Sequence, residues 1–390
     1  MTSFPVPLSL YLHIPFCRTK CTYCAFNTYV NLEALIEPFV RALIREVEIV
    51  GTGNPGYVIG TIYFGGGTPS LLKPEQIARI LAVIHSCFIV SNDAEISLEA
   101  NPNDLDYSYL KALRQLGINR LSIGMQTANA NELALFARRH DNDTVMRAVS
   151  SARRAGFDNL NLDLIYGFPH QTLESWDASL RQLLALQPEH ISLYALGLED
   201  GTPMAVWVSR GRLPTPDDDL TADMYERAAD MLAAAGYEQY EISNWSKPGF
   251  ASRHNLQYWR NLPYVGLGPG AHGYAAGIRY STVLSPHNYI QVLETSVSSY
   301  GFPYTPATDQ AIVVDRAGEI AETLMMGLRL TQEGIPRHAF SERFGSDLLE
   351  IHGTTIEKFK RYGLLYVDTE VVRLTQRGRL LSNVVFRELI

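Results

Sequence analysis

Residues 8–24 read LSLYLHIPFCRTKCTYC and join a mostly apolar run to three closely spaced cysteines. The run 8–14 predicts a buried β-strand. The cysteines follow it directly as CxxxCxxC, at Cys17, Cys21 and Cys24. Three thiols crowded at this spacing do not fit the disulfide framework of a secreted protein. The segment therefore predicts a strand that ends in a metal or redox site.

Apolar strands alternate with helical stretches on the C-terminal side of this segment. The further strands are expected at 59–65, 95–100, 119–125, 160–166 and 190–196. The helices are expected at 32–50, 74–88, 104–116, 142–155 and 173–186. Such a βα repeat indicates a parallel sheet covered by helices. Residues 1–200 therefore predict an α/β fold with a partial (β/α)6 barrel, although a doubly wound sheet would give the same pattern.

The pattern changes after residue 200, and two further parts are expected. Residues 201–304 contain a helix near 220–235 and an aromatic, glycine-rich stretch, and 300–308 have the composition of a linker. Residues 305–390 predict a helical, winged-helix-like domain with helices near 310–327, 336–344 and 353–362, the hairpin LLYVDTEVVRLT and a helix from 376. Nine Lys and Arg against eight Asp and Glu leave 331–390 at +1. We therefore expect a structural or docking module that binds no nucleic acid.

Composition narrows the class of protein further. The chain has 390 residues, 46% of them hydrophobic and 19% charged, with a net charge of −8. That length suits two or three domains at roughly 100–200 residues each, and the acidic balance disfavours a general nucleic-acid binder. No Lys or Arg precedes Arg18, and no apolar run approaches the roughly 18–20 residues of a membrane span. A reducing, cytoplasmic location is expected.

The cysteine cluster suits soft metals such as zinc or the iron of an iron–sulfur cluster. A structural zinc site needs four ligands, and no second CxxC or HxxxH follows downstream. Cys87, the remaining cysteine, has the pattern of a buried small apolar residue. Three thiolates on a cubane cluster would leave one iron open to an external ligand. Zinc binding and chance clustering remain the alternatives.

The motif, with the aromatic Tyr23 directly before the last cysteine, resembles the radical S-adenosylmethionine (radical SAM) superfamily. The resemblance implies a partial (β/α)6 barrel and a [4Fe–4S] cluster held by Cys17, Cys21 and Cys24, with SAM on the open iron. It also implies that the GGGTP loop receives the SAM amino group, so we expect bulk at Gly67 to block SAM while leaving the cluster intact. Taken alone, GGGTP could equally be a turn.

Further matches to the superfamily fall at the ends of successive strands, where ligand sites of barrels gather. A single acidic residue in such a strand more often lines the barrel without binding a ligand. Five polar positions on successive strand ends or their loops are hard to explain by chance alone. By resemblance, the SAM-contacting positions are Tyr11, Gly66, Gly67, Thr68, Glu99, Gln126, Arg138 and Asp163. Tyr23 and Phe26 are expected to shield or contact the cluster and the adenine. No catalytic residue is assigned.

The whole chain resembles the HemN-like group of oxygen-independent coproporphyrinogen III dehydrogenases, through LYLHIPFC, YFGGGTPSLL, RLSIGMQ and NLDLIYGFPHQT. Those dehydrogenases carry a further cysteine two residues after the third, where this chain has Phe26, and a longer N-terminal arm than the sixteen residues before Cys17. The HemW subfamily of heme-binding proteins is similar at CAF and at HNLQYW, residues 254–259. That resemblance implies a heme motif at His254, Asn255, Tyr258 and Trp259.

Two functions and one simpler reading follow from these resemblances. The first is a heme chaperone that binds heme, a [4Fe–4S] cluster and SAM and transfers heme to acceptor proteins, with respiratory and membrane-associated proteins as candidates and a homodimer as a candidate assembly. The second is a radical SAM enzyme of porphyrin metabolism that decarboxylates coproporphyrinogen III. An electron-transfer or structural metalloprotein is the third reading. A histidine near two aromatic residues is often only structural, and His272 in the glycine-rich stretch is a weaker heme candidate than His254.

Overall fold

The computed structural model describes residues 7–296 and 299–389. Its backbone forms two compact units. Unit 1 comprises Met1–Ala228 and Pro263–Ile312, and unit 2 comprises Ala229–Leu262 and Val313–Ile390. The polypeptide therefore leaves unit 1, enters unit 2, returns to unit 1 and ends in unit 2. The three parts expected from the sequence, 1–200, 201–304 and 305–390, are not the same as these two units, and that division stays a prediction.

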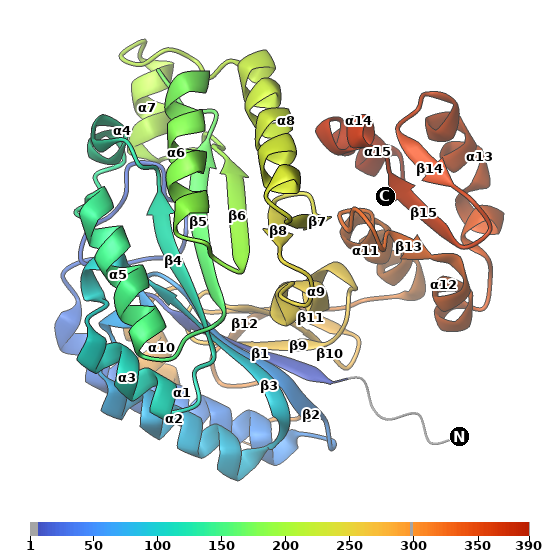
Figure 1. The fold of residues 1–390 in the computed structure, drawn as a ribbon. Coiled ribbons are helices and arrows are strands. Elements are labelled where there is room, and N and C mark those ends of the chain that lie inside the picture. Colours follow the sequence, from blue (N-terminus) through green and yellow to red (C-terminus); the bar gives the residue numbers. More distant parts are fainter. Residues whose placement is uncertain (1–6, 297–298, 390) are drawn as a thin grey trace. The chain divides into compact units, whose positions relative to one another are not determined.

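Six parallel strands form the frame of unit 1 (Figure 1). They are β1 (Leu8–Ile14), β2 (Val58–Gly66), β3 (Ile89–Ala100), β4 (Arg120–Gln126), β5 (Leu160–Tyr166) and β6 (His190–Ala195). The helices that connect them or follow them are α1 (Ile36–Gly53), α2 (Pro74–Cys87), α3 (Tyr107–Gln115), α4 (Ala130–Leu135), α5 (Asn142–Arg154), α6 (Leu173–Ala185) and α7 (Pro203–Ser209). In the strand order β1 and β6 are not neighbours. The predicted α/β fold with an open, partial barrel is confirmed.

The return segment of unit 1 extends the sheet beyond β1. It contains β9 (Tyr264–Leu267), β10 (His272–Ala275), β11 (Ile278–Thr282), α10 (Pro286–Thr295) and β12 (Thr308–Val313). β9 pairs parallel to β1, with Ser9 opposite Tyr264, and β10 and β11 continue antiparallel. Residues 300–307, expected to be part of a linker, contain no helix or strand and connect α10 to β12 within unit 1, with Thr305 and Ala307 buried. The helix expected from about 310 begins at Arg316, because residues 308–313 form β12.

The outer faces of the barrel strands explain why the sequence folds in this way. Leu8, Leu10, Leu12 and Ile14 of β1 are all completely buried, so this strand packs its apolar side chains under the covering helices. Helices α3, α5 and α6 begin at side-chain caps: Asp141, for example, accepts a hydrogen bond from the backbone N–H of Thr144 at the start of α5. Local sequence and packing therefore favour the same elements.

Glu46 on α1 fastens the return segment of unit 1. Its carboxylate is completely buried. Oε2 accepts hydrogen bonds from the backbone N–H of Gly268 (2.8 Å) and the hydroxyl of Tyr289 (2.6 Å), and Oε1 accepts one from the Thr305 hydroxyl (2.8 Å). Burial raises the pKa of Glu46, and these three donors oppose the rise. One carboxylate thus joins α1 to three points more than 200 residues away.

Glu46→Ala is expected to lower the free energy of unfolding by about 3 kcal/mol or more, because each of three buried donors loses its acceptor at a cost of about 1–3 kcal/mol. Urea denaturation followed by circular dichroism measures this change. Glu48→Ala, an exposed site on the same helix, is the control and should stay within about 0.5 kcal/mol of the parent. Equal stability of the two variants would contradict the role given to Glu46.

Unit 2 is built mainly from helices and contains a small antiparallel sheet. Its elements are β7 (Glu238–Glu241), β8 (Asn244–Ser246), α9 (Arg253–Trp259), α11 (Arg316–Gly327), β13 (Ile335–Pro336), α12 (Arg337–Phe344), α13 (Leu348–Arg361), β14 (Leu365–Val367), β15 (Val371–Leu374), α14 (Gln376–Leu380) and α15 (Ser382–Leu389). The last three strands pair in the order β13-β15-β14. α8 (Asp218–Ala234) spans the boundary between the units. The expected C-terminal helical, winged-helix-like architecture is confirmed.

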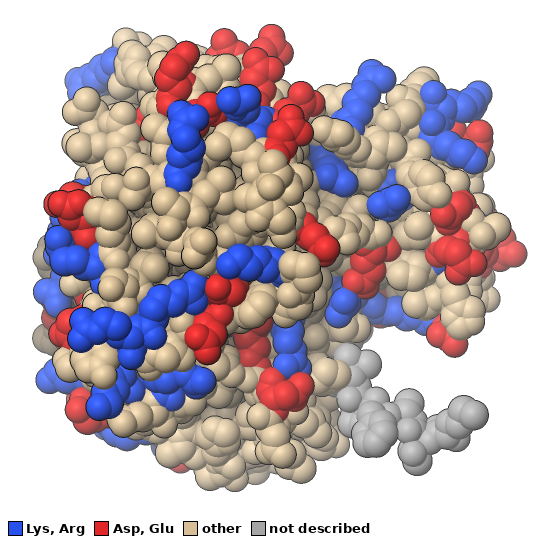
Figure 2. Space-filling model, viewed as in Figure 1, with Lys and Arg blue, Asp and Glu red and all other residues tan. Residues whose placement is uncertain are grey.

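Leu324, Phe340, Ile356, Phe359 and Val385 belong to the buried core of unit 2. On the face drawn in Figure 2, basic and acidic side chains are interspersed. Within residues 7–296 and 299–389, none of the helices combines the length and the apolar character that a membrane crossing needs.

Candidate functional site

The three cysteines lie on the loop that follows β1. The loop is closed by backbone hydrogen bonds from Cys17 N to Tyr29 O (2.9 Å) and from Tyr29 N to Pro15 O (2.7 Å). Lys20 Nζ holds its far side by donating to Phe26 O (3.1 Å) and to Thr28 O (3.2 Å). All three cysteines are free and partly buried. The loop therefore keeps its shape through backbone contacts that do not involve the thiols.

Two polar side chains contact the thiols. The Thr68 hydroxyl donates to Cys17 Sγ (3.4 Å), and Arg138 Nη1 donates to Cys21 Sγ (3.6 Å). Burial raises the pKa of the Cys17 thiol, and the negative charges of Cys24 and Cys21 raise it further. The three thiols are therefore close enough to sense one another, and donors are available to thiolates.

This donor set fits an iron–sulfur cluster. Three free thiols lie on one loop, and a cluster of this kind spreads its iron atoms over separate thiolates. Cys87 ends α2 and packs against α1, where a Cβ on Gly51 would lie 2.5 Å from its own Cβ. Cys87, expected to be buried, is only partly buried there, as the three loop cysteines are.

The glycine-rich loop after β2 lies against the segment that leads to the cysteines. Gly67 N donates to Ile14 O (2.8 Å), and a Cβ on Gly67 would come within 2.7 Å of Phe16 O. Gly66 has φ +109°, a conformation that side chains other than glycine rarely adopt. The glycines are thus required by close backbone packing on β1, in addition to any ligand they receive.

Gly67→Val is expected to lower both iron content and SAM affinity, because the added side chain would push against the backbone directly before Cys17. This differs from the expectation based on sequence alone, in which bulk at Gly67 spared the cluster. Iron analysis and a SAM binding isotherm measure the two effects. Gly301→Val is the matched control, because a Cβ there would meet nothing within 4 Å and its φ, like that of Gly67, lies outside the left-handed region. Normal iron content in Gly67→Val would contradict this reading.

Glu99 at the end of β3 faces the same loop. Its Oε1 accepts a hydrogen bond from the Tyr63 hydroxyl (2.9 Å), and its Oε2 accepts one from Gly66 N (3.0 Å). Burial raises the pKa of Glu99 to about 7, and the nearby charge of Asp163 raises it too, while both hydrogen bonds oppose the shift. The carboxyl therefore changes its charge near neutral pH.

Asp163 is held by a hydrogen-bonded network inside the barrel. Asn161 Nδ2 donates to Asp163 Oδ1 (2.6 Å) and to the Ser122 hydroxyl (2.7 Å). Asn161 Oδ1 accepts from His190 Nδ1 (2.7 Å) and from the Ser192 hydroxyl (3.1 Å). Burial holds the pKa of His190 well below its ordinary value. Sequence reasoning missed Asn161 and His190, although their two-residue spacing from Asp163 and Ser192 places both on the inner face.

Arg138 joins the cysteine loop to the end of β4. Its Nη2 donates to Gly124 O (2.9 Å), while Nη1 reaches Cys21. Within the described part of the chain its buried Nε has no hydrogen-bond partner. Gln126 has φ +67°, and a Cβ on Gly124 would lie 2.5 Å from the Gln126 side chain. The left-handed turn therefore brings Gln126 back over Gly124, next to Arg138.

The other predicted positions of the barrel have different surroundings. The Tyr11 hydroxyl shares a hydrogen bond of 3.0 Å with His13 Nδ1, and the Tyr11 ring stacks on the Tyr63 ring. Tyr23 packs edge-on against Phe136, with ring centroids 4.9 Å apart. Phe26 is 70% exposed. Tyr23 is therefore part of an apolar cluster beside the cysteine loop, whereas Phe26 presents its ring to solvent.

The predicted heme motif forms α9 in unit 2. His254 is buried, and its Nε2 shares a hydrogen bond of 2.8 Å with the Tyr258 hydroxyl. Asn255 N donates to the Ser252 cap. The Arg329 guanidinium lies 4.6 Å from the centre of the Trp259 ring. All four motif residues are thus engaged in contacts within the unit, Asn255 through its backbone.

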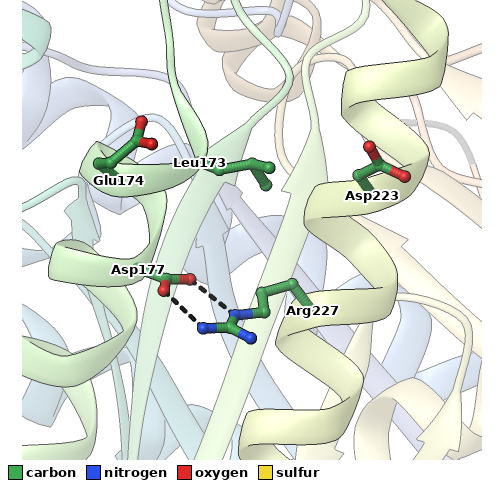
Figure 3. Close-up of a pocket in the computed structure, with 5 residues that line it drawn as sticks. All are labelled: Leu173, Glu174, Asp177, Asp223 and Arg227. Carbon is green, nitrogen blue, oxygen red and sulfur yellow. Dashed lines mark hydrogen bonds and ion pairs between the residues drawn. The ribbon is translucent and has the colours of Figure 1, made fainter.

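A surface hollow of about 270 Å³ lies between α6 and α8, and Figure 3 shows its lining residues. Arg227 donates to both carboxylate oxygens of Asp177 at 3.1 and 2.9 Å. Leu173, Glu174 and Asp223 complete the lining. The arrangement is an ion pair with two exposed acids around it, and it contains none of the residues predicted to bind a cofactor.

Comparisons with known proteins agree with this architecture. The family model of the radical SAM superfamily matches residues 11–183, and that of the HemN C-terminal domain matches residues 314–381. The solved structure described as coproporphyrinogen III oxidase (HemN) from Escherichia coli covers 98% of this chain and 90% of its own, with a TM-score of 0.83 at 24% identity. At that identity the likeness shows the fold.

Curated relatives are more similar in sequence. The heme chaperone HemW of Bacillus subtilis is 38% identical over 97% of this chain and 98% of its own length. The heme chaperone HemW of Lactococcus lactis is 36% identical over 98% of this chain and 97% of its own length. Since these similarities extend over nearly the whole of both chains, the protein belongs to the HemW family within the radical SAM superfamily.

Proposed function

We propose that this chain is a heme chaperone that binds heme, a [4Fe–4S] cluster and SAM and transfers heme to acceptor proteins. The observation that carries the proposal is the full-length similarity to relatives named heme chaperones. The occurrence of Phe26 after the cluster motif, where dehydrogenases of the group are expected to have a cysteine, supports the same choice. We also propose a cytoplasmic location, with a homodimer as a candidate assembly.

In this proposal Cys17, Cys21 and Cys24 hold the cluster. Support comes from their position on one closed loop, their mutual electrostatic influence and the donors that Thr68 and Arg138 direct at two of the thiols. A cluster held by three thiolates supplies an iron that can take an external ligand. The protein's own task is to keep the thiols in place and to limit solvent around them.

SAM would then bind at the carboxyl ends of the barrel strands. Glu99 is the carboxylate available beside the glycine-rich loop, and Asp163 is fixed by Asn161 farther round the barrel. The unpartnered Nε of Arg138 supports a ligand at that side of the site. The proposed contacting set is Tyr11, Tyr23, Phe26, Gly66, Gly67, Thr68, Glu99, Gln126, Arg138 and Asp163.

The second candidate function is the oxidative decarboxylation of coproporphyrinogen III. The fold likeness to the Escherichia coli HemN structure favours it. One anaerobic, cluster-loaded preparation separates the two candidates when it is given dithionite, SAM and coproporphyrinogen III and, in a parallel sample, hemin. We expect saturable hemin binding and no protoporphyrinogen. Formation of protoporphyrinogen would overturn the chaperone assignment, and an unchanged cluster spectrum on adding SAM would favour a simple metalloprotein.

A further inference from the structure

A buried chain of hydrogen bonds runs inside the barrel from His190 on β6 to Asp163 on β5. His190 Nδ1 lies 2.7 Å from Asn161 Oδ1, and Asn161 Nδ2 lies 2.6 Å from Asp163 Oδ1. The parallel register of the two strands brings these side chains together, because Asn161 pairs with His190 and Asp163 pairs with Ser192. His190 and Asn161 are both buried. Neither of them is in the set proposed to contact SAM.

The carboxylate at the end of this chain determines the direction of each hydrogen bond. An ionised Asp163 only accepts hydrogen bonds, so Asn161 must turn its amide nitrogen toward it. Ser122 requires the same orientation, because its hydroxyl donates to Asp163 Oδ2 (3.2 Å) and therefore accepts from Asn161 Nδ2 (2.7 Å). Asn161 Oδ1 then faces the imidazole, and a hydrogen bond there needs a donor. We therefore assign the proton of the neutral His190 ring to Nδ1.

The reverse orientation of the Asn161 amide would conflict with an ionised Asp163. It would bring Oδ1 to the place of Nδ2, which is 2.6 Å from a carboxylate oxygen. Two acceptors so close together repel each other unless a proton lies between them, so this orientation requires a neutral carboxyl. Burial raises the pKa of Asp163, and the hydrogen bond from Asn161 is the first of those that oppose the rise. A donor that fixes the amide therefore also favours the ionised carboxylate.

Ser192 does not replace His190 as this donor. Its hydroxyl reaches Asn161 Oδ1 at 3.1 Å, but it also forms a hydrogen bond with Asp163, and it has only one proton to give. The imidazole is closer, at 2.7 Å. Burial holds the pKa of His190 well below its ordinary value, so the ring stays neutral and its single proton remains available at Nδ1.

We propose that His190 is a positioning residue for SAM, whose Nδ1–H orients the Asn161 amide and thereby keeps Asp163 ionised and in one orientation. The inference rests on the proposed contact between SAM and Asp163, and it adds the residue that acts through this carboxylate. His190 itself does not touch the ligand in this account. Its effect on SAM affinity depends on one donor atom.

The test is equilibrium binding of SAM to the anaerobic, cluster-loaded full chain. His190→Phe keeps a flat ring but lacks the donor, and it is expected to weaken SAM binding by about fivefold or more. His190→Asn offers an amide N–H in place of Nδ1–H and should stay within about twofold of the parent. Thr61→Val is the matched control: it removes a buried hydroxyl of β2 that donates to Ser9 Oγ (2.6 Å), and β3 and β4 separate β2 from β5. It should leave SAM affinity unchanged.

A second comparison separates positioning from a general loss of structure. In an Asp163→Ala background, His190→Phe should cause no further loss of SAM affinity, because it acts through the carboxylate that is already absent. A further loss in that background would show that the ring supports the barrel in another way and would overturn the inference. Asn161→Leu removes the middle of the chain and should weaken SAM binding as His190→Phe does, so it provides the same test if His190→Phe does not fold.

The remaining outcomes are equally decisive. If the parent chain binds SAM and both His190→Phe and Asn161→Leu bind it equally well, the positioning role is wrong while the proposed SAM site stands. If His190→Asn loses as much affinity as His190→Phe, the shape of the ring matters and its donor does not, which also overturns the inference. If the parent chain itself binds no SAM, the proposed SAM site fails and the inference fails with it. Iron content equal to that of the parent shows that each variant has kept its cluster.

Discussion

Cys17→Ala is expected to reduce the iron content of anaerobically reconstituted protein from about four atoms per chain to nearly none. The substitution removes one of three thiolates, and two ligands do not hold a cubane cluster stably. The fold should survive, because the loop is closed by backbone hydrogen bonds between residues 15, 17 and 29. Iron and sulfide analysis, together with the visible absorption of the cluster, measures the loss.

Cys87→Ala is the matched control for this experiment, since it removes a thiol that packs between α1 and α2 outside the loop. Its iron content should equal that of the parent chain. Full iron loading in Cys17→Ala would refute the ligand assignment, and equal loss in both variants would point to general instability.

SAM affinity is expected to rise about tenfold between pH 6 and pH 8, and Glu99→Gln should remove this dependence. The pKa of Glu99 is raised to about 7, first by burial. A carboxyl with that pKa is about one-tenth ionised at pH 6 and about nine-tenths ionised at pH 8. Because the SAM sulfonium is a cation, the ionised carboxylate favours binding. Equilibrium binding of SAM to cluster-loaded protein at several pH values measures the slope.

The same pKa has the opposite consequence for stability. Since the folded state holds the Glu99 proton more tightly than the unfolded state, the stabilising contribution of Glu99 to folding is fully present below about pH 4.5 and is lost as the pH rises to about 7.

In the SAM binding experiment, Glu75→Gln, on the exposed side of α2, controls for the loss of one surface charge. A pH slope that persists in Glu99→Gln would show that another group governs SAM binding.

The barrel strands were predictable because their signal is local. The predicted strands 8–14 and 160–166 agree with β1 and β5 residue for residue. Both carry apolar side chains on the face toward the helices, so composition alone identifies them. The short strands β9 to β12 gave no comparable signal, because four to six residues carry little periodicity. The pairing of β9 with β1 also depends on residues about 250 positions away.

Part of the functional site could likewise be recognised from neighbouring residues in the sequence, and part of it depends on contacts between distant residues. The spacing of the cysteines identified the loop, since ligand spacing is a property of the sequence itself. Glu46 could not be recognised as a fastening residue, because its partners Gly268, Tyr289 and Thr305 come together only in the folded unit. The sequence identified Gly67 through its motif. A side chain at position 67 would point toward Phe16 O, and this depends on packing that the sequence does not show.

The assignment as a heme chaperone depends on heme binding by the unmodified chain. Anaerobic, cluster-loaded protein titrated with hemin should give a Soret band that reaches a plateau, and excess apomyoglobin should then recover the bound heme. A band that grows in proportion to added hemin without saturation, as for hemin in buffer, would contradict the assignment as a heme chaperone.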